Sequence, residues 1–103
     1  MKEPEANNTH SDLDELRKAI DRIDEKLINL LTQRSNCVEK IAEIKCHSKV
    51  SIYDSERENK ILQAVTENNP TKYQSVDMAN IFHAILRAGL NQQLLYRSEH
   101  IDD

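Results

Sequence analysis

The most constraining feature of this sequence is a regular series of apolar residues that begins at Leu13 and meets no glycine or proline before Lys45. The residues are spaced three and four apart, which is typical of an amphipathic helix with one apolar stripe. The stripe comprises Leu13, Leu16, Ile20, Ile23, Leu27, Leu30, Ile41 and Ile44. A helix over this stretch, capped by Ser11 or Asp12, would be about 50 Å long. That length is too great for a compact monomer of 103 residues.

A second, shorter helix is predicted after a polar loop over residues 46–53. Asp54 or Ser55 can cap its N-terminus, and Ser55 with Glu58 has the spacing of a capping box. The two asparagines and the proline of residues 68–70 end this helix.

A third helix is predicted from a cap at Ser75 to about Arg97, because apolar residues again recur with helical spacing. These residues are Met78, Ile81, Phe82, Ile85, Leu86, Leu90 and Leu94. Neither short helix can cover the whole first helix by folding back once. We therefore expect an all-α fold with three helices per chain, one of them very long, in which a second copy of the chain covers the rest of the long stripe.

The bulk properties predict one domain over residues 13–97, between a flexible N-terminal tail of residues 1–12 and a C-terminal tail of residues 98–103. The formal net charge of -4 argues against nucleic acid or an anionic membrane as the main partner. No stretch is apolar enough for a signal peptide or a membrane span. Cys37 and Cys46 lack the spacing of a disulfide framework or a metal site, so no metal is expected and a cytoplasmic location fits best.

A positive charge occupies one position of the long stripe where an apolar residue belongs. The rhythm of the stripe places Arg34 between Leu30 and Ile41. A guanidinium in that position needs an anion, because burial of an unpaired charge costs several kcal/mol. The anion is either a protein carboxylate in a salt bridge inside the dimer or a bound ligand; an arginine that reaches past the edge of the stripe into water is the remaining alternative.

Two further cations belong to the same long helix. Lys45 follows Arg34 by about three helical turns and shares its face, so the two side chains can bracket a small anion. Alternatively, Lys45 only complements the helix dipole. Arg17 precedes Arg34 by about 25 Å, too far to serve the same pocket in one chain. In an antiparallel pair of helices it would complete the partner's pocket, and otherwise it is a surface residue paired with Asp14 or Asp21.

Three charged residues share one face at the predicted start of the second helix, namely Asp54, Arg57 and Glu58. Helix capping is a sufficient structural reason for them. As a functional group, the two carboxylates can accept a hydrogen bond from a substrate hydroxyl while the arginine binds an acid or secures the loop.

Gly89 is the only glycine, and within the third helix it costs about 1 kcal/mol relative to alanine. Close helix packing explains it, and room for a ligand is the alternative. Gln93 lies one turn later on the same face and offers both a donor and an acceptor, although such a glutamine is normally solvated. The four histidines are dispersed without the spacing of a metal site or a catalytic triad, so none is assigned a role.

The sequence resembles the all-helical chorismate mutases, often called the AroQ class. The resemblance covers roughly residues 13–97 and rests on LDELRKAIDRIDEKLINLLTQR at residues 13–34, Lys45, YDSERE at residues 53–58 and a late glutamine. It implies an intertwined homodimer that rearranges chorismate to prephenate in phenylalanine and tyrosine biosynthesis.

The resemblance also implies roles for the cations and the glutamine. Arg34 and the partner's Arg17 bind the two carboxylates of chorismate, while Lys45 and Gln93 donate to its ether oxygen. Because the reaction is pericyclic, no proton, hydride or metal changes hands and no cofactor is implied. Catalysis then comes from holding the substrate in its reactive conformation and stabilising charge on the ether oxygen.

The remaining roles concern the ring hydroxyl, which Glu58 and Asp54 are implied to hold while Arg57 supports the same corner. One position departs from the family pattern, because members commonly carry a serine where this chain has Gly89. A side-chain hydrogen bond to a substrate carboxylate is therefore missing. Weaker binding, a compensating backbone or water contact, and an altered substrate preference all remain open.

Two other functions compete with this one. An isochorismate-pyruvate lyase resembles the same fold and uses similar cations, but the cluster of Asp54, Arg57 and Glu58 favours the mutase. The other is a noncatalytic dimerisation or regulatory module, in which Arg34 forms only a buried ion pair.

Overall fold

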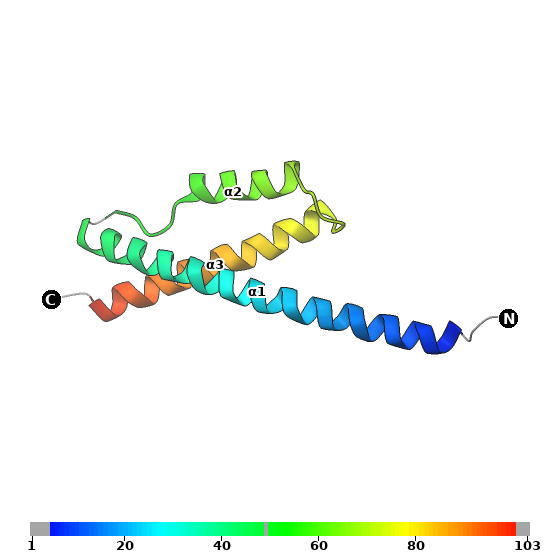
Figure 1. The fold of residues 1–103 in the computed structure, drawn as a ribbon. Helices are drawn as coiled ribbons and strands as arrows, with labels where there is room; N and C mark the ends of the chain where they lie inside the picture. The colour runs from blue at the N-terminus through cyan, green and yellow to red at the C-terminus, as the bar shows by residue number, and fades with distance from the viewer. Residues whose placement is uncertain (1–4, 49, 101–103) are drawn as a thin grey trace. The chain divides into compact units, whose positions relative to one another are not determined.

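The computed structural model describes residues 5–48 and 50–100, and it contains three helices and no strand within these ranges (Figure 1). Helix α1 spans Glu5–Ser48, α2 spans Ser55–Glu67 and α3 spans Ser75–His100. The predicted all-α fold with one very long helix is confirmed. No helix in the described part of the chain is both long enough and apolar enough to traverse a lipid bilayer.

Helix α1 starts earlier than predicted. The sequence predicted a helix start at a cap on Ser11 or Asp12, but residues 5–12 are helical as well; residues 1–4 lie outside the described residues. The physical reason is that each residue added to an existing helix gains a backbone hydrogen bond without a new nucleation cost. Polar residues of modest helix propensity can therefore extend a helix that begins elsewhere. The limits of the domain stay a prediction.

Of the two caps considered for α2, Asp54 is the one used. Its backbone is extended, and its carboxylate accepts a hydrogen bond from the amide of Arg57 at 3.0 Å. The helix ends where the sequence predicted, and the amide of Asn68 donates to the carbonyl of Ala64 at 3.4 Å.

Helix α3 begins at Ser75, but the predicted capping role of this serine is wrong. The carbonyl of Gln74 accepts the first helical hydrogen bonds, from the amides of Asp77 and Met78. Ser75 is already helical, and its hydroxyl donates instead to the carbonyl of Thr66 at 3.2 Å. This bond joins the end of α2 to the start of α3, and the two helices pack against each other.

The chain divides into two units, one up to Arg34 and one from Ser35 onward. The described part of the first unit is a single helical segment, and its large apolar side chains are exposed, for example Leu16 at 62%, Ile20 at 53% and Leu27 at 51%. A lone helix cannot cover its own apolar stripe. The small core of the chain belongs to the second unit, where the buried apolar residues are Val38, Ala42 and Ile52.

Candidate active site

The C-terminal turn of α1 holds Lys45 in a fixed direction. Its side chain is half-buried, and its ammonium group donates a hydrogen bond to the carbonyl of Ile52 at 3.0 Å. Ile52 is itself buried, so this carbonyl is a defined anchor rather than part of a loose surface loop. An ammonium group has three donors, and two remain for other acceptors after this bond. Lys45 is therefore both oriented and able to bind a ligand oxygen.

At the start of α2, Asp54 binds the backbone amides of Arg57 and Glu58. Asp54 accepts the amide of Arg57 with its carboxylate, and its carbonyl accepts the amide of Glu58 at 3.0 Å. One carboxylate oxygen of Asp54 is thus engaged in capping, as the structural interpretation of the cluster predicted. Glu58 is half-buried and Arg57 is exposed. Glu58 is consequently the better placed carboxylate for a ligand hydroxyl.

Helix α3 contributes a buried amide oxygen that lacks a hydrogen-bond partner among the described residues. The Oε1 atom of Gln93 is buried and accepts no hydrogen bond from the described part of the chain. A buried polar atom without a partner costs roughly 1–3 kcal/mol, so this oxygen marks a position where a further group is expected. The oxygen and nitrogen of an amide exchange places by a rotation of the terminal torsion, so Gln93 can present either an acceptor or a donor there.

Gly89 is the one buried residue of α3 among those described. Three residues later, Gln92 joins α3 to α1. Its Nε2 donates to the carbonyl of Ser35 at 2.8 Å and to the carboxylate of Glu39 at 3.0 Å. These bonds hold α3 close to the second half of α1. A buried glycine beside such a contact supports the prediction of close helix packing, since a larger side chain would separate the backbones.

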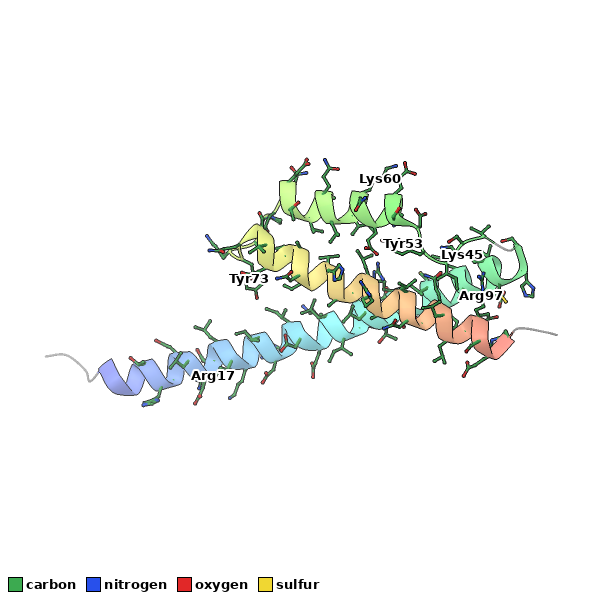
Figure 2. The ribbon with its side chains drawn as sticks, turned by 180° about the vertical axis from the view of Figure 1, so that it is seen from behind. Arg17, Lys45, Tyr53, Lys60, Tyr73 and Arg97 are labelled. Atoms are coloured by element: carbon green, nitrogen blue, oxygen red, sulfur yellow. The ribbon has the colours of Figure 1, made fainter. Side chains whose placement is uncertain are left out.

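Two residues of α3 outside the predicted set donate hydrogen bonds to the second half of α1. They are Gln92, described above, and Arg97, whose Nη2 donates to the carbonyls of Lys45 at 3.0 Å and Val50 at 3.2 Å. Figure 2 shows Arg97 and Lys45 close together where α1 and α3 end. No periodicity or motif in the sequence singles out these two polar residues, because their partners lie 47 to 57 positions away and three of the four are backbone carbonyls.

The hydrogen bonds described so far join residues of the second unit only. They bring Lys45 together with the segment that leads into Asp54, and they hold α3 beside the end of α1. Arg17 and Arg34 belong to the first unit. Arg17 is exposed and labelled on α1 in Figure 2, and Arg34 is half-buried. The roles assigned to these two arginines stay predictions.

One titrating group in the second unit has a perturbed environment. The ring of Tyr96 stacks on that of His100, with centroids 3.9 Å apart and an angle of 12° between the planes. Desolvation raises the pKa of Tyr96 above its ordinary value of 10.0, and the negative charges of Glu43, Cys46 and Glu39 act in the same direction. A neutral phenol stacked in this way is a packing group.

Comparison with known proteins identifies the family. Residues 16–94 match the family model described as chorismate mutase type II. The chain is 36% identical over 84 residues to a bifunctional chorismate mutase/prephenate dehydratase of Aquifex aeolicus, an alignment that covers 78% of this chain and 23% of the relative. It is 40% identical over 53 residues to a chorismate mutase of Methanocaldococcus jannaschii, covering 52% of this chain and 54% of that protein.

A solved structure agrees with this assignment. A chorismate mutase of Thermus thermophilus, in its form II, superimposes with a TM-score of 0.77 at 26% identity, over 88% of this chain and 98% of the other. The present chain spans less than a quarter of the length of the bifunctional relatives and about half of the curated single-function one.

Proposed function

We propose that this chain, which belongs to the type II chorismate mutase family, converts chorismate to prephenate and so serves phenylalanine and tyrosine biosynthesis. The observation that carries the proposal is that one unit holds both a Lys45 ammonium oriented by its bond to Ile52 and a buried Gln93 Oε1 that has no hydrogen-bond partner in the described part of the chain. All eight candidate residues lie within the matched residues 16–94. The structural similarity of 88% of this chain to a solved chorismate mutase supports the same conclusion.

The proposed chemistry needs only hydrogen bonds and charge. Lys45 donates to the ether oxygen of chorismate with one of the donors that its bond to Ile52 leaves over. Gln93 donates to the same oxygen from Nε2, after a rotation of its terminal torsion that exchanges the places of Oε1 and Nε2. Negative charge grows on the ether oxygen as its bond to the ring breaks, so both contacts strengthen in the transition state. No cofactor takes part.

The two ends of the substrate require further groups. In the proposed complex, Glu58 accepts a hydrogen bond from the ring hydroxyl of the substrate, and the second carboxylate oxygen of Asp54 assists it. Arg57 supports the same part of the pocket. Arg34 and Arg17 of the partner subunit bind the two carboxylates. Guanidinium groups suit this task, because their paired donors match the two oxygens of a carboxylate.

A homodimer is part of the proposal. The described part of the first unit exposes most of its apolar stripe, and this includes Leu13, Leu16, Ile20, Ile23, Leu27 and Leu30. Contiguous apolar surface of this kind is characteristic of an interface that another chain covers. A second copy satisfies the requirement with the same surface on both sides of a twofold axis. Such an arrangement also brings Arg17 to a pocket in the neighbouring chain.

A cytoplasmic location is likewise proposed. Cys37 and Cys46 are both free thiols, which is typical of a reducing compartment.

Gly89 gives the proposed site a distinctive feature, because it offers a substrate carboxylate no side-chain donor. We expect a water molecule or a backbone amide to supply the contact that a serine would make. A serine in this position would contact a carboxylate rather than the ether oxygen, so we expect its absence to lower substrate affinity more than the rate of the chemical step.

The direct test is to incubate the purified protein separately with chorismate and with isochorismate and to identify the products. Prephenate from chorismate supports the proposal, whereas salicylate and pyruvate from isochorismate would identify a lyase. Arg34→Ala should abolish turnover in a protein that still folds. Arg22→Ala is the matched control, because it removes an exposed arginine of the same helix. Full activity of folded Arg34→Ala would falsify the assigned role.

A further inference from the structure

Arg97 makes contacts that the proposed catalytic roles do not require. It lies on α3 one turn after Gln93 and just beyond the residues that match the family model. Its half-buried guanidinium donates from Nη2 to the carbonyl of Lys45 at 3.0 Å and to that of Val50 at 3.2 Å (Figure 2). One side chain of α3 therefore connects the last turn of α1 with the segment that follows it.

The contact to Lys45 meets a need that every helix end has. The last four carbonyls of a helix have no partner within the helix, and α1 ends at Ser48, so the carbonyl of Lys45 is one of these four. A cation near this end also interacts favourably with the helix dipole. Hydrogen bonds from a guanidinium are stronger than those between neutral groups. Arg97 is thus a firm cap rather than an incidental neighbour.

The same few residues also fix the side chain of Lys45. Its ammonium donates to the carbonyl of Ile52, two positions after the carbonyl of Val50 that Arg97 holds. We call this set of Arg97, Lys45, Val50 and Ile52 the Arg97 bracket. Within it, Arg97 binds the backbone carbonyl of Lys45. It also binds the carbonyl of Val50, in the segment that contains Ile52, the residue that accepts the hydrogen bond from the Lys45 ammonium. Two residues after Ile52 comes Asp54, which caps α2.

We propose that Arg97 is a positioning residue of the active site, which acts by holding the Lys45 ammonium and the segment before α2 in their working geometry. The inference rests on the proposed mutase function and adds a residue to it. Arg97 touches no reacting atom; it acts on the chemical step through Lys45.

The bracket predicts a particular kinetic signature. Without Arg97, Lys45 keeps its charge and its reach but loses the fixed direction of its donor. Small misplacement of a catalytic group is costly, and here it affects an interaction that strengthens in the transition state. The proposed carboxylate contacts made by the arginines of α1 are untouched. We therefore expect kcat to fall about 10- to 100-fold while KM changes less than about threefold.

The experiment compares three variants of the full chain. Arg97→Met removes the guanidinium but keeps an unbranched apolar side chain. Arg97→Lys retains a cation that can still reach one carbonyl, so it should recover part of kcat. Arg87→Met is the matched control, because Arg87 is an exposed arginine on the same helix and its guanidinium lies within hydrogen-bond distance of His83, a residue of that helix rather than of α1. The control should match the wild type in kcat and KM.

Hydrogen exchange supplies a readout that does not depend on turnover. In Arg97→Met, amide exchange should accelerate in the last turn of α1 and in residues 50–54, while the amides of α2 and the first half of α3 keep wild-type protection. A uniform acceleration over all three helices would assign Arg97 a merely structural role and overturn the inference. Unchanged kcat in a variant that keeps full protection would do so as well.

The outcome for the wild type separates this inference from the proposed function. No conversion of chorismate by the wild-type protein would overturn the function and, with it, the catalytic meaning of the bracket. An active wild type together with a fully active Arg97→Met variant would overturn the bracket alone.

Discussion

The apolar stripe of α1 allows a sharp test of the proposed dimer at Leu27. In the single chain this side chain is 51% exposed. Full burial of a leucine contributes about 1.5–3 kcal/mol, so covering the exposed half contributes about 0.8–1.5 kcal/mol per chain. A twofold interface contains the residue twice. Leu27→Gln should therefore cost about 1.5–3 kcal/mol of association free energy, which raises the dimer dissociation constant roughly 10- to 100-fold.

The substitution is chosen so that little else changes. Leucine and glutamine have nearly equal helix propensities, and the side chains are similar in length. Lys26→Gln is the control, because it makes a comparable change at the adjacent exposed position. Sedimentation velocity over a range of protein concentrations gives the dissociation constant of each variant. Far-ultraviolet circular dichroism checks that each one remains helical.

A monomeric protein would give the opposite result. In a chain that works as a monomer, Leu27 stays in water, and changes at such surface positions usually alter stability by less than about 0.5 kcal/mol. Equal behaviour of Leu27→Gln and Lys26→Gln, or a wild-type protein that sediments as a monomer at micromolar concentration, would refute the reasoning.

Three further predictions concern single groups. Lys45→Met should lower kcat at least about 100-fold, the usual cost of losing a donor to developing charge, with prephenate formation as the assay; a loss below tenfold would exclude the assigned role. Inactive Arg17→Ala and Arg34→Ala proteins should regain activity when mixed and allowed to exchange subunits, and no recovery in a demonstrated heterodimer would contradict a shared site. The pKa of Tyr96 is raised in the folded state, so as the pH rises the phenol ionises first in the unfolded chain. Ionisation then favours unfolding, and the free energy of unfolding should fall as the pH rises above 10.0. Urea unfolding at rising pH should show a smaller loss for Tyr96→Phe than for the wild type, and equal losses would count against it.

The helical fold was predictable because local patterns and long-range packing agree. The spacing of apolar residues in α1 and α3 follows the helical period, and the three helices are separated near the two predicted breaks. The first break was predicted too early, because α1 continues to Ser48, three residues into the loop predicted over residues 46–53. Errors arose at helix ends, where several polar residues compete for the same role. Ser75 has the chemistry of a cap, but the carbonyl of Thr66 attracts its hydroxyl and Gln74 starts the helix.

Only the charged residues of the candidate site could be predicted from the sequence. Arg34 stands out because its charge takes an apolar position of the stripe, and Lys45 because it shares the face of Arg34. The cluster at the start of α2 stands out because charges are repeated within one turn. The residues that orient them do not stand out. Gln92 and Arg97 act on backbone carbonyls of α1, and any residue type supplies a carbonyl. A sequence pattern cannot predict a hydrogen bond to a distant backbone carbonyl, so the contact is seen only in the structure.

Association and catalysis should therefore be linked in this protein. Helix α1 carries both the exposed apolar stripe and Arg17, the residue proposed to complete the partner's pocket. If the stripe is the interface, a dissociated chain lacks one carboxylate contact as well as its cover. The specific activity of Leu27→Gln should then fall on dilution, with a midpoint equal to its dimer dissociation constant and at a higher concentration than for the wild type. Specific activity that stays constant while the dimer dissociates would separate the two functions of α1 and leave Arg17 without its proposed role.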